Sequence, residues 1–152
     1  MSSGYPILVS ACLLGVNCRY DGTNTYHQGV IDYLTNNNLQ PIPVCPEQLG
    51  GLSTPRSKAW FVRGDGDDFL QGKAQLTDET GQNPTELFLR GAEETVRIAH
   101  LCRCKTAILK QRSPSCGSRQ IHRNGQLVKG TGITCALLQQ QGFKILSEED
   151  LY

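Results

Sequence analysis

Short apolar runs alternate with helical segments along this chain, and three of the runs lead into a string that contains a cysteine. Each has the length and composition of a buried β-strand: Ile7–Val9, Pro41–Val44 and Thr106–Leu109. The strings that follow are SACLLG, VCPE and SPSCG. An open parallel α/β sheet gathers its ligands in the crevice beyond the carboxyl ends of its strands. We therefore expect Cys12, Cys45 and Cys116 to converge on one metal or cofactor.

Helices are predicted over His27–Leu34 and from Asn83 to about Cys102, because apolar residues recur there every three or four positions. A final helix is expected near Cys135–Gln141. In the longest one, Asn83 is a typical N-cap before Pro84, and Glu86 is placed to complete a capping box. A last strand is expected over Phe143–Leu146.

The alternation of strands and helices predicts an α/β fold, a small Rossmann-like three-layer domain with a mostly parallel four-stranded sheet. The string PEQLGGLSTPR after Cys45 is expected to be a loop, because it is rich in glycine and proline. Ala59–Arg63 and Lys73–Thr77 flank a Gly- and Asp-rich turn and predict a β-hairpin inserted beside the sheet. The length of 152 residues fits a single domain over residues 1–152.

The charge balance and hydropathy of the chain argue against nucleic acid and membranes as binding partners. Fifteen basic and 14 acidic residues leave a net charge of +1, without the strong basic excess of a dedicated nucleic-acid-binding protein. A small polar ligand is therefore expected rather than duplex DNA. No stretch approaches the roughly 20 apolar residues that a membrane span needs, and no basic segment precedes the first apolar run. We expect a cytoplasmic protein that does not bind membranes.

The seven cysteines are many for this length, and their number is odd. In a reducing compartment this pattern favours metal binding or thiol chemistry over a disulfide framework. Bending residues stand beside each of the three strand-end cysteines: Gly15, Pro46 and Gly117. We expect them to expose the three sulfur atoms at loop tips, where a metal could reach them.

The other four cysteines are weaker candidates for metal ligands. Cys102 and Cys104 end the longest predicted helix and Cys135 lies in the last one, so we expect these three to pack in the core. Cys18 follows Cys12 in a turn-rich loop, and it is a candidate fourth ligand or resolving thiol. The CxxC pair that is typical of zinc and thioredoxin sites is absent from the sequence.

Three thiolates would leave one open position on a four-coordinate zinc ion, or on a four-iron cluster that normally has four cysteine ligands. Thiolates are soft ligands and select thiophilic metals over magnesium or calcium. Zinc and an iron–sulfur cluster both meet this condition, so the residues alone leave the choice open.

Polar and basic side chains near the cysteines complete the predicted site. Glu47, two residues after Cys45, is placed to exchange protons with a substrate, and a glutamate at a helix start is the ordinary alternative. Ser113 either donates a hydrogen bond to a ligand or caps a turn. Four cations in predicted loops on the same side are candidates to hold an anionic group: Arg19, Arg56, Lys58 and Arg112.

The strings SACLLGVNCRYDG, VCPEQLGGLSTPR and ILKQRSPSCGS, in this order, resemble the thiouracil desulfidase family, also called domain of unknown function 523. The resemblance implies a Rossmann-like domain that holds a 4Fe-4S cluster through only three cysteines, which correspond to Cys12, Cys45 and Cys116. It also implies that Glu47 is the acid/base and that Ser113 orients the substrate or relays a proton.

The reaction that this resemblance implies replaces C=S by C=O in a thiolated uracil and releases hydrosulfide. In this family the free iron takes the thiocarbonyl sulfur, and the net hydrolysis needs no external electron donor. The expected partner is a small thiolated pyrimidine, 2- or 4-thiouracil as the free base or a mononucleotide, and no nucleic acid is expected.

Two alternatives come from other classes of protein. In the first, the three cysteines hold zinc for structure or partner binding, without catalysis. In the second, Cys12 and Cys18 form a disulfide or persulfide in a thiol-based redox or sulfur-carrier protein. Metal analysis and the response to reductant separate these alternatives from a desulfidase.

Overall fold

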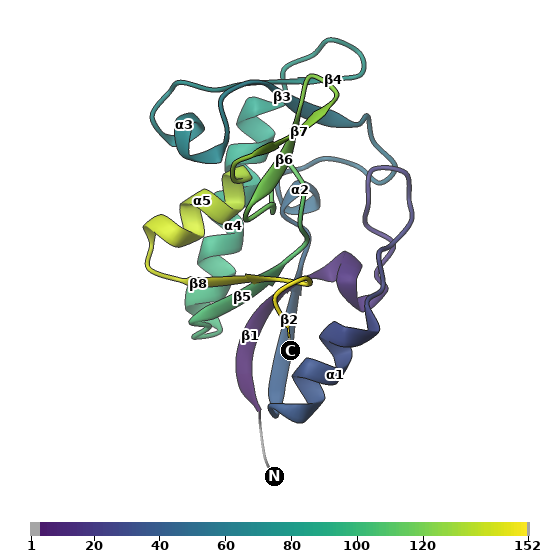
Figure 1. Ribbon diagram of the computed structural model, residues 1–152, viewed down its shortest axis with the longest axis vertical. Coiled ribbons are helices and arrows are strands. Elements are labelled where there is room, and N and C mark those ends of the chain that lie inside the picture. The colour runs from purple at the N-terminus through teal and green to yellow at the C-terminus, as the bar shows by residue number, and fades with distance from the viewer. Residues whose placement is uncertain (1–3, 152) are drawn as a thin grey trace.

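The computed structural model describes residues 4–151, and its first layer is the predicted sheet. Four parallel strands lie in the order β2-β1-β5-β8 (Figure 1). They are β1 (Tyr5–Ser10), β2 (Leu39–Val44), β5 (Thr106–Leu109) and β8 (Lys144–Ser147). The α/β fold with a four-stranded parallel sheet is confirmed, and all four predicted strands are present with small shifts at their ends.

The strand order reverses next to β1, the first strand. The chain places β2 on one side of β1 and then returns to place β5 on the other side. In parallel sheets such a reversal leaves a crevice beyond the carboxyl ends of the two strands at the switch point, because the connections leave them in opposite directions. The strings that follow β1 and β5 therefore face the same crevice.

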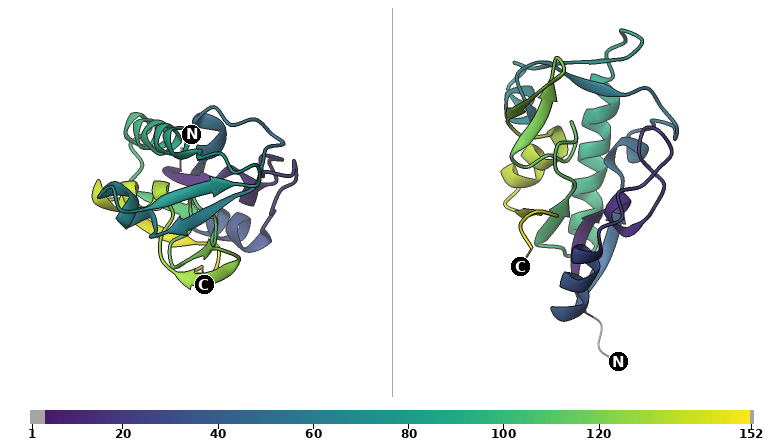
Figure 2. Two further views of the ribbon diagram at one scale, coloured as in Figure 1. Left: turned by 90° about the horizontal axis from the view of Figure 1, so that it is seen from above. Right: turned by 45° about the vertical axis from the view of Figure 1, so that its right-hand side comes forward.

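Helices cover both faces of this sheet. Successive strand residues point to opposite faces, so Ile7 and Val9 contact one side and Leu8 the other. On the first side they pack with Val30 and Leu34 of α1 (Gln28–Asn36). The second side packs against α4 (Thr85–Leu101), which runs along both sheets of the molecule (Figure 2), and α5 (Ile133–Gln140). This is the predicted three-layer arrangement.

A second sheet lies at the end of the molecule toward which the carboxyl ends of the parallel strands point (Figure 1). Its strand order is β4-β3-β6-β7, with β3 (Ala59–Arg63), β4 (Gln75–Asp78), β6 (Gln120–Arg123) and β7 (Gln126–Lys129). The predicted hairpin is its β3–β4 pair, with β4 starting two residues later than predicted. The segment between them is not a plain turn, since it forms a short helix, α3 (Gly66–Leu70), with a capping box between Asp65 and Asp68.

The β6–β7 hairpin is not among the predicted elements. Its two turn residues, Asn124 and Gly125, have φ angles of 50° and 81°, as a two-residue turn of the primed type requires. Asn-Gly between two short alternating strands is a strong hairpin signal, and it stands in the sequence. The hairpin could therefore have been predicted.

The three predicted helices are present with small shifts at their ends, and two further details of the sequence analysis are wrong. The predicted cap of α4 is wrong: Pro84 occupies the N-cap position without a side-chain hydrogen bond, no capping box forms with Glu86, and Asn83 instead accepts a hydrogen bond from the backbone of Thr85 at 3.0 Å. The string after Cys45 is not all loop, because its first residues form a short helix, α2 (Pro46–Leu49), with proline at the first helical position. No helix within residues 4–151 is both long and apolar enough to cross a membrane.

Two glycines let α2 lie directly against α4. A Cβ atom on Gly91 of α4 would overlap the carbonyl oxygen of Pro46, and one on Gly50 would overlap the carbonyl oxygen of Leu87. The two backbones thus contact each other without side chains between them. This contact sets the position of α2, which follows Cys45 and contains Glu47.

Gly91→Ala is expected to destabilise the protein by about 1–3 kcal/mol, because the added methyl group forces α2 away from α4. Urea denaturation followed by circular dichroism measures this change. Glu93→Ala, at an exposed position of the same helix, is the matched control and should change the free energy of unfolding by no more than about 0.5 kcal/mol. Equal stability of the two variants would show that the close contact is not needed.

Candidate active site

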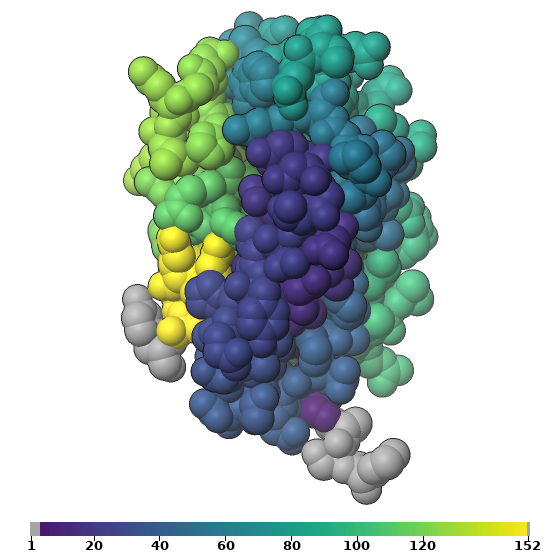
Figure 3. Space-filling view, turned by 90° about the vertical axis from the view of Figure 1, so that its right-hand side faces the viewer, coloured from purple at the N-terminus to yellow at the C-terminus, as the bar shows by residue number. Residues whose placement is uncertain are grey.

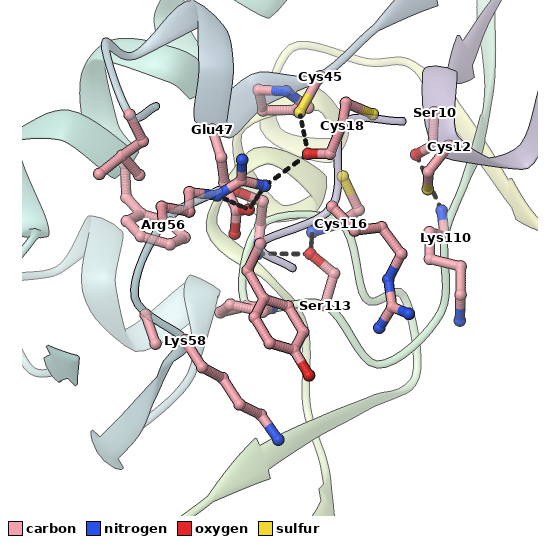
Figure 4. Close-up of a pocket in the computed structure, with 18 of the residues that line it drawn as sticks. Ser10, Cys12, Cys18, Cys45, Glu47, Arg56, Lys58, Lys110, Ser113 and Cys116 are labelled. Atoms are coloured by element: carbon pink, nitrogen blue, oxygen red, sulfur yellow. Dashed lines mark hydrogen bonds and ion pairs between the residues drawn. The ribbon is translucent and has the colours of Figure 1, made fainter. Parts of the chain in front are cut away.

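A cavity of about 610 Å³ lies beyond the carboxyl ends of β1, β2 and β5 (Figure 4). The five residues assigned to the site from sequence all line it: Cys12, Cys45, Cys116, Glu47 and Ser113. The four predicted cations line it as well: Arg19, Arg56, Lys58 and Arg112. The second sheet supplies part of the wall through Ala59, Asp78 and His122. The structure therefore brings every predicted site residue to one cavity.

Two of the cysteines are placed by turns that directly follow strands. After β1 the chain forms a 3₁₀ turn, η1 (Ala11–Leu14), in which the carbonyl of Cys12 accepts hydrogen bonds from the backbone of Gly15 and Thr25. Cys45 follows β2 as the N-cap residue of α2. The expectation of exposed loop tips is wrong, since Cys12 is only 9% exposed and Cys45 is half-buried. The turns fold back over the strand ends, so the sulfur atoms line an internal wall.

Cys116 follows β5 in a longer loop that side-chain hydrogen bonds hold in place. The Oγ of Ser113 accepts from the backbone N–H groups of Ser115 and Cys116, both at 3.1 Å. The side-chain oxygen of buried Gln111 accepts from three consecutive backbone N–H groups that begin at Ser118. Burial raises the pKa of Cys116. Ser113 therefore caps a turn, one of its two predicted roles, and these two bonds do not use its hydroxyl hydrogen.

Cys18 joins the two cysteines of the neighbouring strand ends. Its thiol hydrogen-bonds to both Cys12 and Cys45, and these bonds are the main cause that lowers the pKa of each to about 7, against the effect of burial. Lys110 adds to the lowering at Cys12, and Arg56 adds to it at Cys45. The same hydrogen bonds raise the pKa of Cys18. Cys18 is therefore the thiol of this group that keeps its proton.

The remaining cysteines lie away from the cavity, as predicted. Cys104 and Cys135 are buried in the core and Cys102 is half-buried against it. Burial raises the pKa of Cys104 to about 11 and that of Cys135 to about 12. These thiols behave as small apolar side chains rather than ligands.

Glu47 and Arg56 form a nearly buried ion pair beside Cys45. Nε of Arg56 donates to Oε2 of Glu47 at 3.0 Å, and Nη2 donates to the same oxygen. The side chains are 16% and 6% exposed. Glu47 lies in the first turn of α2 and also lines the cavity. Its position at a helix start therefore does not remove it from the site. Sequence reasoning placed Arg56 near the site but did not predict this pairing.

The other three predicted cations also contact other side chains of the protein. The Arg112 guanidinium pairs with Glu149 at 2.6 Å. Arg19 and Lys58 lie over the ring of Tyr20, at 5.5 and 5.8 Å from its centroid. Of the four cations, Arg56 and Arg112 are thus committed to carboxylates of the protein itself.

The sequence analysis did not predict one ion pair at the cavity, in which Lys110 of the cavity wall takes part. Lys110 directly follows β5 and Glu148 directly follows β8, and their side chains pair at 3.0 Å. The two strands are neighbours whose last residues, Leu109 and Ser147, are in register. The strand-end argument would have predicted this pair if it had been applied to charged residues as well as to cysteines.

The donor set of the cavity suits an iron–sulfur cluster. Three thiols come from three strand ends, and two cationic side chains favour the thiolate forms of two of them, Lys110 at Cys12 and Arg56 at Cys45. Within residues 4–151 no three His, Cys, Asp or Glu side chains are gathered as closely as a single metal ion requires. A cluster does not need that arrangement, because each of its cysteines binds a different iron.

Two known proteins are similar to this chain over almost its whole length. The uncharacterized protein YbbK of Bacillus subtilis (strain 168) is 39% identical over 148 residues, which cover 95% of this chain and 97% of YbbK. The solved structure of the [4Fe-4S]-dependent thiouracil desulfidase TudS matches with a TM-score of 0.80 and 36% identity, over 95% of this chain and 91% of TudS.

The match to a family model covers the whole cavity. The model of 2-thiouracil desulfurase matches residues 7–150, a range that includes all three strand-end cysteines, Glu47 and Ser113. The sequence strings, the fold and the arrangement of the cavity agree with this match. The chain belongs to the 2-thiouracil desulfurase family.

Proposed function

We propose that this chain is a 4Fe-4S-dependent thiouracil desulfidase, which converts the C=S group of a thiolated uracil to C=O and releases hydrosulfide. Membership of the 2-thiouracil desulfurase family and the similarity to TudS support this activity. The observation that carries it is the cavity itself: three strand-end cysteines and Glu47 line the same 610 Å³ space.

The three cysteines would hold the cluster, and no other side chain is needed for this. Cys12, Cys45 and Cys116 would each bind one iron, so that the fourth iron has no protein ligand. When bound, the cluster would supply an open iron, which is a Lewis acid suited to a thiocarbonyl sulfur. Lys110 and Arg56 lie near enough to two of these thiols to balance part of their negative charge.

Glu47 and Ser113 would handle the proton and the substrate. Glu47 would accept a proton from the water that adds to the thiocarbonyl carbon, and would return it as the carbon–sulfur bond breaks. The hydroxyl of Ser113, whose oxygen already accepts two backbone N–H groups, would donate its hydrogen to the substrate ring. Overall, one thiocarbonyl group and one water molecule are converted to one carbonyl group and one molecule of hydrogen sulfide, and no electron donor is needed.

The cavity volume falls within the range of small-ligand sites. We propose a free thiolated base or its mononucleotide as the substrate. The ring would lie at the thiol end of the cavity, next to Glu47.

Anaerobic purification and reconstitution test this function. The expected result is about four irons and four sulfides per chain, the content of one 4Fe-4S cluster, and release of one hydrosulfide per uracil formed from 2- or 4-thiouracil. Zinc without turnover would favour the zinc-binding alternative. A metal-free protein that forms a Cys12–Cys18 disulfide with oxidant would favour the redox alternative.

The ligand set is tested by single substitutions. Iron should be lost in each of the three strand-end variants, because only three ligands are present: Cys12→Ser, Cys45→Ser and Cys116→Ser. Iron should be retained in the four matched controls: Cys18→Ala, Cys102→Ala, Cys104→Ala and Cys135→Ala. Iron and acid-labile sulfide per chain are measured after reconstitution. Loss of iron in the Cys18 variant would identify a fourth protein ligand and leave no open iron.

Glu47→Gln is expected to keep the cluster and lower kcat by about 10²–10⁴-fold, because the amide retains the shape of the side chain but cannot carry the proton. Hydrosulfide release under saturating thiouracil measures kcat, and iron content shows that the cluster remains. Glu93→Gln, at an exposed position of α4, should leave both quantities unchanged. A fully active Glu47→Gln protein would assign the proton transfer to another group.

A further inference from the structure

We infer that Arg56 is a positioning residue, which fixes the carboxylate of Glu47 for proton transfer and does not itself bind the substrate. The inference rests on the proposed function and assigns one more residue to it. Sequence reasoning placed Arg56 among the cations that could hold an anionic group. The hydrogen bonds of its side chain indicate a different role.

Every N–H donor of the Arg56 guanidinium group already has a partner. The group has five donors. Nε donates to Glu47, the two hydrogens of Nη2 go to Glu47 and to the carbonyl of Cys18, and those of Nη1 go to the carbonyl of Ser53 and to Oγ1 of Thr54. The side chain is 6% exposed. No donor is left to hold a substrate anion, so binding a ligand would require breaking one of these bonds.

The two bonds to Glu47 end on one oxygen. Both Nε and Nη2 of Arg56 donate to Oε2. No residue between 4 and 151 donates a hydrogen bond to the other oxygen, Oε1, although Glu47 lines the cavity. Arg56 thus holds the carboxylate by one oxygen and leaves the other to exchange a proton with water or substrate. The two donors lie in one rigid guanidinium plane, so they fix the position of Oε2 more tightly than a single ammonium group would.

The same guanidinium joins Glu47 to the loop that contains Cys18. Nη2 of Arg56 donates to the Cys18 carbonyl at 2.8 Å, and the backbone N–H of Arg56 donates to the Tyr20 carbonyl at 2.8 Å. In the space-filling view, the segment after α2 lies directly against this loop (Figure 3). Because the backbone bond remains in any side-chain variant, the loop keeps one of its attachments when the side chain is replaced.

The test compares Arg56→Ala and Arg56→Lys with the wild-type protein, with Arg97→Ala as the exposed control on α4. Iron per chain, the thermal midpoint of the cluster-free protein, kcat and KM are measured for each. We expect Arg56→Ala to retain its iron and lower kcat by about 10²-fold with KM nearly unchanged, since a misplaced catalytic group costs about that factor. Arg56→Lys keeps the charge but not the fork, and its kcat should also fall.

Two further measurements show whether Arg56 acts through Glu47. Added methylguanidinium should restore part of the kcat of Arg56→Ala, because it can occupy the vacated position, and should not affect the control. In a double-mutant cycle, Arg56→Ala should lower kcat little further once Glu47→Gln is present.

Four outcomes would overturn the inference. They are full kcat in Arg56→Lys, a raised KM with unchanged kcat in Arg56→Ala, independent effects of the two substitutions, and loss of iron in both Arg56 variants, which would show a purely structural role. Failure of the proposed function looks different, because the wild-type protein itself would then release no hydrosulfide.

Discussion

The cavity exists because the strand order reverses at β1. The chain builds β2 on one side of its first strand and β5 on the other, so three strings that are far apart in sequence leave the sheet at the same edge. Each string then contributes one cysteine to the same wall. The close contact of α2 with α4 through Gly50 and Gly91 completes the arrangement, since it fixes the helix that contains Glu47. Sheet topology thus determines which residues meet, and helix packing determines their position.

The electrostatics of the site follow from this convergence. Bringing several thiols and a carboxylate together in a half-closed cavity would be unfavourable without compensating groups. Arg56 and Lys110 supply positive charge, and each is held by a carboxylate, Glu47 and Glu148 respectively. Cys18 supplies a hydrogen bond instead of a charge. The pKa values of the cysteines at the ends of β1 and β2 are consequently lowered, while burial raises the pKa of Cys116 and favours its neutral form.

The parallel sheet, its main helices and the meeting of five candidate site residues in one cavity could be predicted, because strand-end strings and helical periodicity are local signals. The roles of Glu47 and Ser113 were implied by the family resemblance. What it did not reveal depends on contacts across the fold. The pairing of Arg56 with Glu47 requires the loop after α2 to turn back on that helix, and neither residue carries a pattern that indicates this. The burial of Cys12 depends on how η1 folds over the strand end. By contrast, the Asn124-Gly125 hairpin and the Lys110–Glu148 pair could have been predicted, the first from its Asn-Gly turn and the second from the position of both residues directly after a strand.

The second sheet has a consequence for how this cavity can vary. It packs on the same helices as the first sheet, since Phe88 of α4 and Ile133 of α5 contact it while Ala99 and Leu138 contact the parallel sheet. The wall that it supplies, through Ala59, Asp78 and His122, contains none of the cysteines. The cysteines and the wall that lacks them thus belong to two sheets that share one pair of helices. Exchanging side chains on the second sheet would change the shape of this wall and leave the three strand-end cysteines in place.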